Sequence, residues 1–359
     1  MAHIVEIDFK DRQLVRRYER LFEECPDACI QQSADWAEVI QDLGPDRPIF
    51  LLCEHDGRDI AGLPLYLYEQ PTGNILTSVP QPGPLGGVFC RAGLTSEVRT
   101  AAYRALLEQA QTIATRHDCV TISLITNPFE DDLSEYETHL APDYIFENFT
   151  QYVPLDQPAH RNHGHRNNLN RAKAAGFTIS ACKSFDELNT WYALHKTRHT
   201  EIGAQPLDSR LFRNLFERLV SKGKAQLILV KRNGRIVSGG FYIHHRRILD
   251  VFMISFDSTE AKHAPNFLNT DYSMEWAKGL GLTIYNWQSS SNKQCGVYQF
   301  KQQWGSLDRP YYFVTKVTDR HNRLALFSAD VLRRHYPWHY VMPYGVFERG
   351  FAHRRFTKC

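Results

Sequence analysis

The chain has 359 residues, of which 43% are hydrophobic, 23% are charged and 12% are aromatic, and its formal net charge is +2. This composition is typical of a folded globular protein and excludes a disordered or low-complexity chain. The small net charge provides no overall attraction to nucleic acid, so DNA is not predicted as a partner.

Neither a secretion signal nor a membrane span is predicted. Residues 1–20 carry charges throughout, and no run of about 18 or more uncharged apolar residues occurs in the chain. The eight cysteines are scattered, without a C-x-x-C pair or the Cys/His spacing of a zinc site. We therefore expect a cytoplasmic protein with reduced thiols and no integral membrane contact.

The first half of the chain predicts a hairpin, a helix and a strand. Residues 49–68 form two apolar runs around Asp56-Gly57, a dipeptide suited to a hairpin turn with positive φ. A Pro/Gly-rich loop follows at 78–87. The apolar period of residues 96–116 predicts a helix, and the β-branched segment 119–125 predicts a buried strand.

The same order of elements returns later. Residues 226–256 predict a three-strand meander whose first turn is Asn233-Gly234, and a helix is expected over 266–280, with Gly281 as its C-terminal cap, before a strand at 282–288. A duplicated α/β unit is the simplest explanation, although two unrelated α/β halves would give the same pattern.

Helices are predicted between the two copies and after the second one. One helix follows Ser184, which forms a capping box with Glu187, and another follows Asp208. Neither is long enough, or patterned in heptads, to project as a coiled-coil arm. A last helix is expected over 322–335.

These patterns divide the chain into three parts. We expect an N-terminal domain over 1–155 and a C-terminal domain over 156–335. The remaining residues, 336–359, form a basic and aromatic tail that we expect to dock on the body of the protein.

The segment GVYQFKQQWG at 296–305 predicts a short helix with one cation among aromatic and amide side chains. Val297, Phe300 and Trp304 share one face of this helix, and Lys301 lies at the edge of that face. Spacing alone allows two interpretations. Lys301 is a surface lysine that lays its stem along an apolar face, or it is a cation that faces a substrate.

A second cationic segment lies at 160–173, with the sequence HRNHGHRNNLNRAK. On a helix, Arg166, Asn170 and Lys173 share one face. The segment is either a solvated helix face or a cationic surface for the phosphates of a nucleotide-linked acceptor or of a tRNA, with Arg171 also taking part.

No metal site is predicted. His195 and His199 are one helical turn apart, but Lys196 stands where the Glu of an H-E-x-x-H motif would be, and no third ligand is indicated. His160, His163 and His165 give no better case.

The predicted strand at 282–288 contains Trp287 between two amides. Strand alternation would place Trp287 on one face, as an aromatic wall or as core, and Asn286 with Gln288 on the other face. The serines at 289–291 lack a G-x-S-x-G elbow, so a serine hydrolase is not predicted.

Residues 264–305, APNFLNTDYSMEWAKGLGLTIYNWQSSSNKQCGVYQFKQQWG, resemble the C-terminal half of FemX/FemAB-like proteins. The resemblance lies in the helix that ends in W-A-K-x-x-G, in the strand after it and in the G-x-Y-x-F-K-x-x-W-G helix. Residues 166–179 resemble the basic helix-to-strand entry of the family, and 33–40 resemble its N-terminal Trp helix. The resemblance implies an α/β fold of two acetyltransferase-like (GNAT) domains in tandem, with mixed sheets flanked by helices.

The resemblance also implies an activity. It is the transfer of an aminoacyl group from aminoacyl-tRNA, or of an acyl group from another activated donor, to an amine. The acceptor would be a peptidoglycan precursor or a smaller metabolite, possibly phosphate-containing. No cofactor is expected.

The F-K pair of the family's active site falls on Phe300 and Lys301. Lys301 would then stabilise the oxyanion that forms during aminolysis, and the Phe300 carbonyl would take the proton of the attacking amine, directly or through water. The residues expected to bind substrate are Arg166, Arg171, Lys173, Asn266, Trp287 and Tyr298.

The loop before the predicted 266–280 helix bears on the donor. Acetyl-CoA-binding GNAT domains have a glycine-rich turn there, which lets backbone N–H groups approach the pyrophosphate. Residues 260–266, EAKHAPN, lack glycine, and Pro265 removes one N–H. This favours aminoacyl-tRNA as donor, although PQPGPLGG at 80–87 leaves a degenerate CoA site open. The alternatives are an acyl-CoA-dependent N-acyltransferase and a non-catalytic RNA- or ligand-binding relative.

Overall fold

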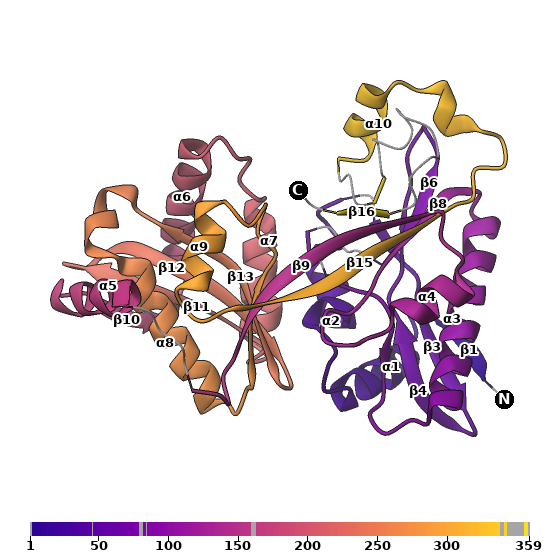
Figure 1. Ribbon diagram of the computed structural model, residues 1–359, viewed down its shortest axis with the longest axis horizontal. Helices are drawn as coiled ribbons and strands as arrows, with labels where there is room; N and C mark the ends of the chain where they lie inside the picture. The colour runs from indigo at the N-terminus through magenta and orange to yellow at the C-terminus, as the bar shows by residue number, and fades with distance from the viewer. Residues whose placement is uncertain are drawn as a thin grey trace. The chain divides into compact units, whose positions relative to one another are not determined.

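The computed structural model describes residues 2–44, 46–78, 82–83, 85–158, 163–337, 341–342 and 355–357. The chain divides into two compact units, which are Met1–Phe149 with Pro310–Cys359 (unit 1) and Thr150–Arg309 (unit 2). Strands β9 (Tyr144–Pro154) and β15 (Leu307–Val317) each contribute residues to both units (Figure 1).

Unit 1 contains two groups of paired strands. One is an antiparallel sheet in the order β1-β3-β4-β7, and the other has the order β15-β8-β6-β5-β2, in which β6 and β8 are parallel. Its strands are β1 (His3–Ile7), β2 (Asp46–Pro48), β3 (Phe50–His55), β4 (Arg58–Leu63), β5 (Tyr66–Tyr68), β6 (Asn74–Thr77), β7 (Phe89–Cys90), β8 (Cys119–Ile125) and β16 (Arg355–Thr357). Its helices are α1 (Arg12–Glu24), η1 (Ile30–Gln32), α2 (Ala34–Ile40), α3 (Ser96–Arg116), α4 (Leu133–His139), η4 (Arg323–Leu326) and α10 (Ala329–His335).

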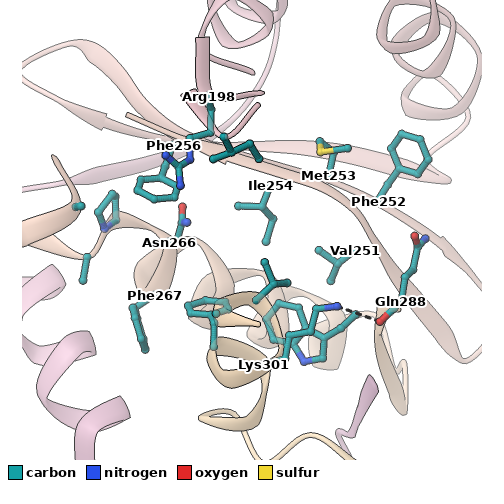
Figure 2. Close-up of a pocket in the computed structure, with 18 of the residues that line it drawn as sticks. Arg198, Val251, Phe252, Met253, Ile254, Phe256, Asn266, Phe267, Gln288 and Lys301 are labelled. Atoms are coloured by element: carbon teal, nitrogen blue, oxygen red, sulfur yellow. Dashed lines mark hydrogen bonds between the residues drawn. The ribbon is translucent and has the colours of Figure 1, made fainter. Parts of the chain in front are cut away.

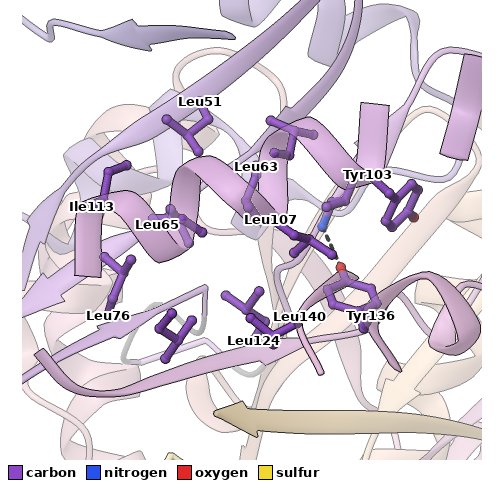
Figure 3. Close-up of a cluster of buried hydrophobic side chains, with 14 of the residues drawn as sticks. Leu51, Leu63, Leu65, Leu76, Tyr103, Leu107, Ile113, Leu124, Tyr136 and Leu140 are labelled. Carbon is purple, nitrogen blue, oxygen red and sulfur yellow. Dashed lines mark hydrogen bonds between the residues drawn. The ribbon is translucent and has the colours of Figure 1, made fainter. Parts of the chain in front are cut away.

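The core of unit 1 forms around α3. Its apolar face, which includes Leu107 and Ile113, packs against Leu63 and Leu124 from the strands (Figure 3). All four side chains are fully buried. Burial of each such side chain is worth roughly 1.5–3 kcal/mol, so this cluster contributes strongly to the stability of the unit.

Unit 2 contains one sheet in the order β10-β11-β12-β13-β14-β9. All neighbours in it are antiparallel except β13 and β14, which are parallel. Its strands, besides the ends of β9 and β15, are β10 (Thr178–Ala181), β11 (Ala225–Arg232), β12 (Arg235–His245), β13 (Ile248–Phe256) and β14 (Ile284–Gln288). Its helices are α5 (His163–Ala174), α6 (Phe185–Glu201), α7 (Ser209–Asn214), the π-helix η2 (Leu215–Val220), η3 (Ser258–His263), α8 (Pro265–Gly279) and α9 (Gly296–Gln302).

Helices α6 and α8 cover opposite faces of the unit 2 sheet (Figure 1). Successive residues of a strand face opposite sides, and β12 has two adjacent glycines where the helices come close. A Cβ atom on Gly239 would meet Trp191 of α6, whereas one on Gly240 would meet Asn269 of α8. The two glycines therefore let both layers approach the same strand.

Strands β13 and β14 stay paired for only three residues. Their register joins Ile248 to Ile284, Leu249 to Tyr285 and Asp250 to Asn286, and the pairing ends there. On its other side, β13 has a bulge, because Val251 pairs with Tyr242 while Met253 pairs with Phe241. Beyond Asp250 the two strands therefore separate.

The structure confirms most of the expected elements. Both hairpin turns have positive φ, at Asp56 (50°) and Gly57 (75°) and at Asn233 (51°) and Gly234 (79°). The helix over 96–116 and the strand over 119–125 are α3 and β8 with the same bounds. The helix expected over 322–335 is wrong, because this segment forms the short η4 and α10 with a break between them. None of the described helices is both long and apolar enough to cross a lipid bilayer.

The units also differ from the domain boundaries expected from sequence. Residues 310–335 were expected in the second domain, but they belong to unit 1 because β15 pairs with β8 through Phe313–Val317. Of the expected tail at 336–359, Val341 and Met342 are buried and β16 pairs with β9. Most of the rest lies outside the described residues, as do His160 and part of the loop at 78–87.

The substitution Gly239→Ala is expected to destabilise unit 2. The added Cβ would lie 2.4 Å from Cδ1 of Trp191, which is itself fully buried. Overpacking of this kind costs typically about 1–3 kcal/mol. Gly279→Ala is the matched control, since nothing lies within 4 Å of its added Cβ. Chemical denaturation of both variants checks the prediction, and equal stabilities would contradict it.

Candidate active site

Unit 2 contains a cavity of about 600 Å³ where β13 and β14 separate. Figure 2 shows side chains from β13, such as Val251 and Ile254, opposite Phe267 of α8 and Lys301 of α9. The last residues of α6 also line it. Its volume lies in the range of pockets that enclose small-molecule substrates.

Lys301 is buried in the wall of this cavity. Its side chain is 5% exposed, and its Nζ donates hydrogen bonds of 3.0 Å to the carbonyl oxygens of Gln288 and Ser289. The short helix α9 that carries it starts at the N-cap Cys295, whose Sγ accepts a hydrogen bond from the Tyr298 N–H. The ammonium is therefore fixed at the cavity, and the interpretation of Lys301 as a solvated surface lysine is wrong.

Aromatic side chains hold α9 in place. The Phe300 ring packs edge-on against Phe267 at 5.1 Å and Trp287 at 5.8 Å, while Trp304 is 1% exposed beneath them. The Phe300 carbonyl oxygen accepts a hydrogen bond of 3.2 Å from the Gln303 N–H. A carbonyl oxygen has two lone pairs, so this contact leaves a second acceptor position.

Gln288 is a candidate that sequence reasoning missed. Its backbone has a φ of 60°, its carbonyl oxygen holds Lys301, and its side chain lines the cavity. Its Nε2, and the Nε1 of Trp287, are buried without a hydrogen-bond partner among the described residues. An unmade buried hydrogen bond costs about 1–3 kcal/mol, and a residue other than glycine at positive φ is strained. The unsatisfied donors and the strained residue thus lie together at the cavity wall.

The strained backbone also explains why the expectation for this strand was wrong. Alternation placed Gln288 on the face opposite Trp287, together with Asn286. In the structure Asn286 is fully buried and donates a hydrogen bond to Asp250, whereas Trp287 and Gln288 both line the cavity. Positive φ at Gln288 ends the alternation, and no local sequence signal marks that change.

Three of the six residues expected to bind substrate line the cavity. They are Arg171, Asn266 and Trp287. Arg171 is exposed and donates a hydrogen bond to Asn168, and Asn266 accepts one of 2.8 Å from Ser238.

The other three lie elsewhere. Arg166 is exposed and is not among the described lining residues. Lys173 is paired with Asp271 at 3.5 Å, and the Tyr298 hydroxyl donates to Asp308 at 3.1 Å. Five residues separate Arg166 from Arg171, which turns the two side chains about 140° apart on a helix.

The contacts of His195 indicate a structural role. Its Nε2 accepts a hydrogen bond of 3.3 Å from the Leu207 N–H, so its Nδ1 carries the proton and lies 3.1 Å from the Ser255 Oγ. Burial, with a smaller effect of His199, lowers the pKa of His195 to about 4. No group of three or more His, Cys, Asp or Glu able to hold a metal ion occurs in the part of the chain that the structure describes.

Replacing His195 with Gln should reduce the loss of stability in acid. The folded pKa of about 4 lies below the usual histidine pKa of 6.5, so the fold favours the neutral ring. Its contribution is complete above pH 6.5 and is lost as the pH falls to 4, by at most about 3 kcal/mol. The free energy of unfolding measured from pH 7 to 4 should therefore fall less steeply in His195→Gln than in the wild type. His3→Gln, at an exposed position, is the control, and equal slopes in all three proteins would contradict the assignment.

Comparison with known proteins places the cavity in a recognised domain. Residues 159–302 match the family model described as an acetyltransferase (GNAT) domain. This segment lies within unit 2 and includes Lys301. No curated protein matches the chain.

Several solved structures share the fold. The crystal structure of FemX has a TM-score of 0.68 at 16% identity, over 89% of this chain and 98% of that one. The C-terminal domain of a putative lysylphosphatidylglycerol synthetase from Agrobacterium fabrum has a TM-score of 0.56 at 14% identity, over 89% and 96%. A tandem GNAT protein from the clavulanic acid biosynthesis pathway has a TM-score of 0.53 at 13% identity, over 88% and 98%. The expected fold of two GNAT-like domains in tandem is thus confirmed.

Proposed function

We propose that this chain, an acyltransferase of the GNAT fold with a FemX-like tandem architecture, forms an amide bond by aminoacyl transfer. The donor in this proposal is aminoacyl-tRNA, and the acceptor is the amine of a peptidoglycan precursor or of a small metabolite. One observation carries the proposal. Lys301 is 5% exposed and lies in the wall of an apolar cavity within the GNAT domain.

The reaction develops negative charge on one oxygen atom. The acceptor nitrogen attacks the ester carbonyl carbon, a C–N bond forms, and the carbonyl oxygen becomes an oxyanion. Collapse of this intermediate breaks the C–O bond to the tRNA ribose, and the proton of the amine passes to the leaving oxygen. A fixed cation beside the oxyanion lowers this barrier without having to reorganise.

The described residues supply parts suited to these steps. Two backbone carbonyls hold the Lys301 ammonium in one position, where it would stabilise the oxyanion. The Phe300 carbonyl, with its second lone pair, would accept a hydrogen bond from the attacking amine. The N–H groups of Trp287 and Gln288 are further donors at the same wall.

The segment before α8 supports a tRNA donor. Residues Ser258–His263 form the 3₁₀-helix η3, which is tied down by ion pairs of Glu260 with Arg232 (2.8 Å) and Arg235 (2.9 Å). Ala264 follows with a φ of 56°, and Pro265 is the first residue of α8. This turn is poorly suited to bind the pyrophosphate of CoA, because its side chains hinder close approach to the backbone and proline lacks an N–H to donate. In this proposal Arg171 contacts a phosphate at the cavity, while Arg166 and Lys173 contact tRNA outside it.

An acyl-CoA donor remains the second candidate, and one observation favours it. The N-terminus of α8, with Ala264, Pro265 and Asn266, lines the cavity beside the opening between β13 and β14. The positive end of a helix dipole attracts phosphate groups. The tandem GNAT protein with a similar fold is described in its form without AcCoA.

Replacing Lys301 with Ala should reduce turnover by roughly 10²-fold or more, the scale of losing one oxyanion donor. The fold should still form, which circular dichroism would show, with a lower melting temperature because the Gln288 and Ser289 carbonyls lose a hydrogen-bond donor. Lys293→Ala is the matched control, because Lys293 is 58% exposed and its ion partner is Asp308. Turnover of the Lys301 variant within a few-fold of the wild type would remove this residue from the mechanism.

Treatment with ribonuclease should separate the two donors. A mixture of charged tRNAs with labelled amino acids is incubated with the protein and candidate amines, and the amide product is identified by mass spectrometry. Prior ribonuclease treatment should abolish the product, because only a tRNA donor is destroyed. Acetyl-CoA is then added to the ribonuclease-treated samples. An acetylated product in these samples would favour the second candidate. Ligand binding that is insensitive to Lys301→Ala, without product from any donor, would indicate a non-catalytic RNA- or ligand-binding relative.

A further inference from the structure

We infer that the cavity selects an acyl group with a bulky apolar side chain, aliphatic or aromatic, in preference to a charged or a very small one. This inference rests on the proposed acyl transfer, and it specifies which group is transferred. Its evidence is the chemistry of the cavity wall beside Lys301.

The wall between the two ends of the cavity is apolar. Figure 2 shows Lys301 and Gln288 at one end and Arg198 with Asn266 at the other, with Val251 and Ile254 between them. None of the described residues that line the cavity is an aspartate or a glutamate. An acyl group whose carbonyl lies beside Lys301 would therefore extend along hydrocarbon.

The bulge in β13 decides which of its side chains form this apolar wall. In a regular strand, alternate side chains face one side. Here the bulge at Phe252 interrupts the alternation, so Val251 and Ile254 pack with the apolar cluster on the α8 side, whereas the Phe252 ring packs against Phe212 of α7. The opposite wall consists of the Trp287 and Phe300 rings. A small acyl group such as glycyl would leave much of this surface without a contact.

Two large apolar side chains are exposed where they line the cavity. Ile202, just after α6, is 56% exposed, and Val297 of α9 is 58% exposed. A bound apolar group would remove both from water, which is favourable. Their exposure is a second observation, independent of the buried wall, that points to an apolar ligand.

The charges of the lining disfavour a cationic acyl group. The charged side chains that line the cavity are Arg171, Arg198 and Lys301, and all three are positive. A lysyl group would bring another ammonium beside them without a carboxylate to pair with, and an unpaired charge is costly to bury. Arg198 is already paired with Glu201 at 2.9 Å and lies over the Phe256 ring, so it does not offer an empty site to an acidic acyl group.

Unreactive mimics of the donor's 3′ end test this inference by binding alone. The probes are 3′-aminoacylamino-3′-deoxyadenosines with leucyl, phenylalanyl, glycyl, lysyl and glutamyl groups, titrated calorimetrically into the full chain. We expect the leucyl and phenylalanyl probes to bind at least about 10-fold more tightly than the glycyl probe, on the scale of methylene groups in an apolar pocket. The lysyl and glutamyl probes should bind at least about 10-fold more weakly than the leucyl probe. Affinities that are equal, or that favour lysyl or glutamyl, would overturn the inference and leave the proposed function standing.

A pair of variants locates the effect at the cavity. Val297→Asp places a carboxylate at an exposed position of the lining, so it should not perturb the core. It should weaken the leucyl probe by about 10-fold and narrow its advantage over the lysyl probe. Leu326→Asp is the same kind of change in unit 1, at a side chain that is 78% exposed, and it should change nothing. An equal response of both variants would overturn the assignment to this cavity.

The failure of the proposed donor gives a different result. If none of the adenosine probes binds, the tRNA donor is wrong, and the acyl preference is then measured with acetyl-CoA against octanoyl-CoA. Tighter binding of the octanoyl thioester would support the inference with the second donor. Equal binding of the two thioesters, or binding of neither, would overturn it.

Discussion

The early separation of two parallel strands is the constraint on which the candidate site depends. β13 and β14 pair through three residues only, and the chain after Asn286 has no strand partner on that side. Backbone carbonyls that have no neighbouring strand to bond to still need hydrogen-bond donors when they are buried. Lys301 supplies them, because its ammonium binds the carbonyl oxygens of Gln288 and Ser289. The same side chain thus closes the end of β14 and places a positive charge in the space that the separation opens.

Rigid surroundings hold this charge in the position that the proposed reaction requires. The Phe300 ring packs edge-on against both Phe267 and Trp287, and Trp304 lies buried beneath them. A cation that is already positioned before the reaction stabilises an oxyanion better than one that must move into place. The strain at Gln288 and the unpaired donors of Trp287 and Gln288 occur at the same wall. In a stable domain such costs persist only where the surrounding packing compensates for them.

The cavity is divided by chemistry into a reactive end, an apolar wall and a cationic end. Lys301 lies at the first, the bulged part of β13 forms the second, and Arg198 lies at the third (Figure 2). This order suits an acyl group whose carbonyl lies at the first end and whose side chain extends along the apolar wall. The ion-paired turn before α8 contains no glycine, in contrast to a glycine-rich phosphate loop. A common fold, as shared with FemX at 16% identity, is therefore compatible with a different choice of donor and acyl group.

Local sequence was sufficient wherever a few neighbouring residues dictate the backbone. The dipeptides Asp56-Gly57 and Asn233-Gly234 adopt the positive φ that their hairpins need, and the apolar period of α3 predicts both of its ends. The helix that carries Phe300 and Lys301 was also predictable, because its apolar spacing lies within seven residues.

Only the tertiary structure decided which residues meet at the cavity. The helical period placed Lys301 at the edge of an apolar stripe, but what that edge faces depends on β14, thirteen residues earlier in the chain. The strand pattern could not place Gln288, since its positive φ ends the alternation. The sequence of the basic segment did not show that Arg171 lines the cavity while Arg166 and Lys173 do not. Residues 310–335 belong to unit 1 because β15 pairs with β8. The physical reason is that turns and helices arise from contacts within a few residues, whereas a cavity arises where distant segments fail to pack completely.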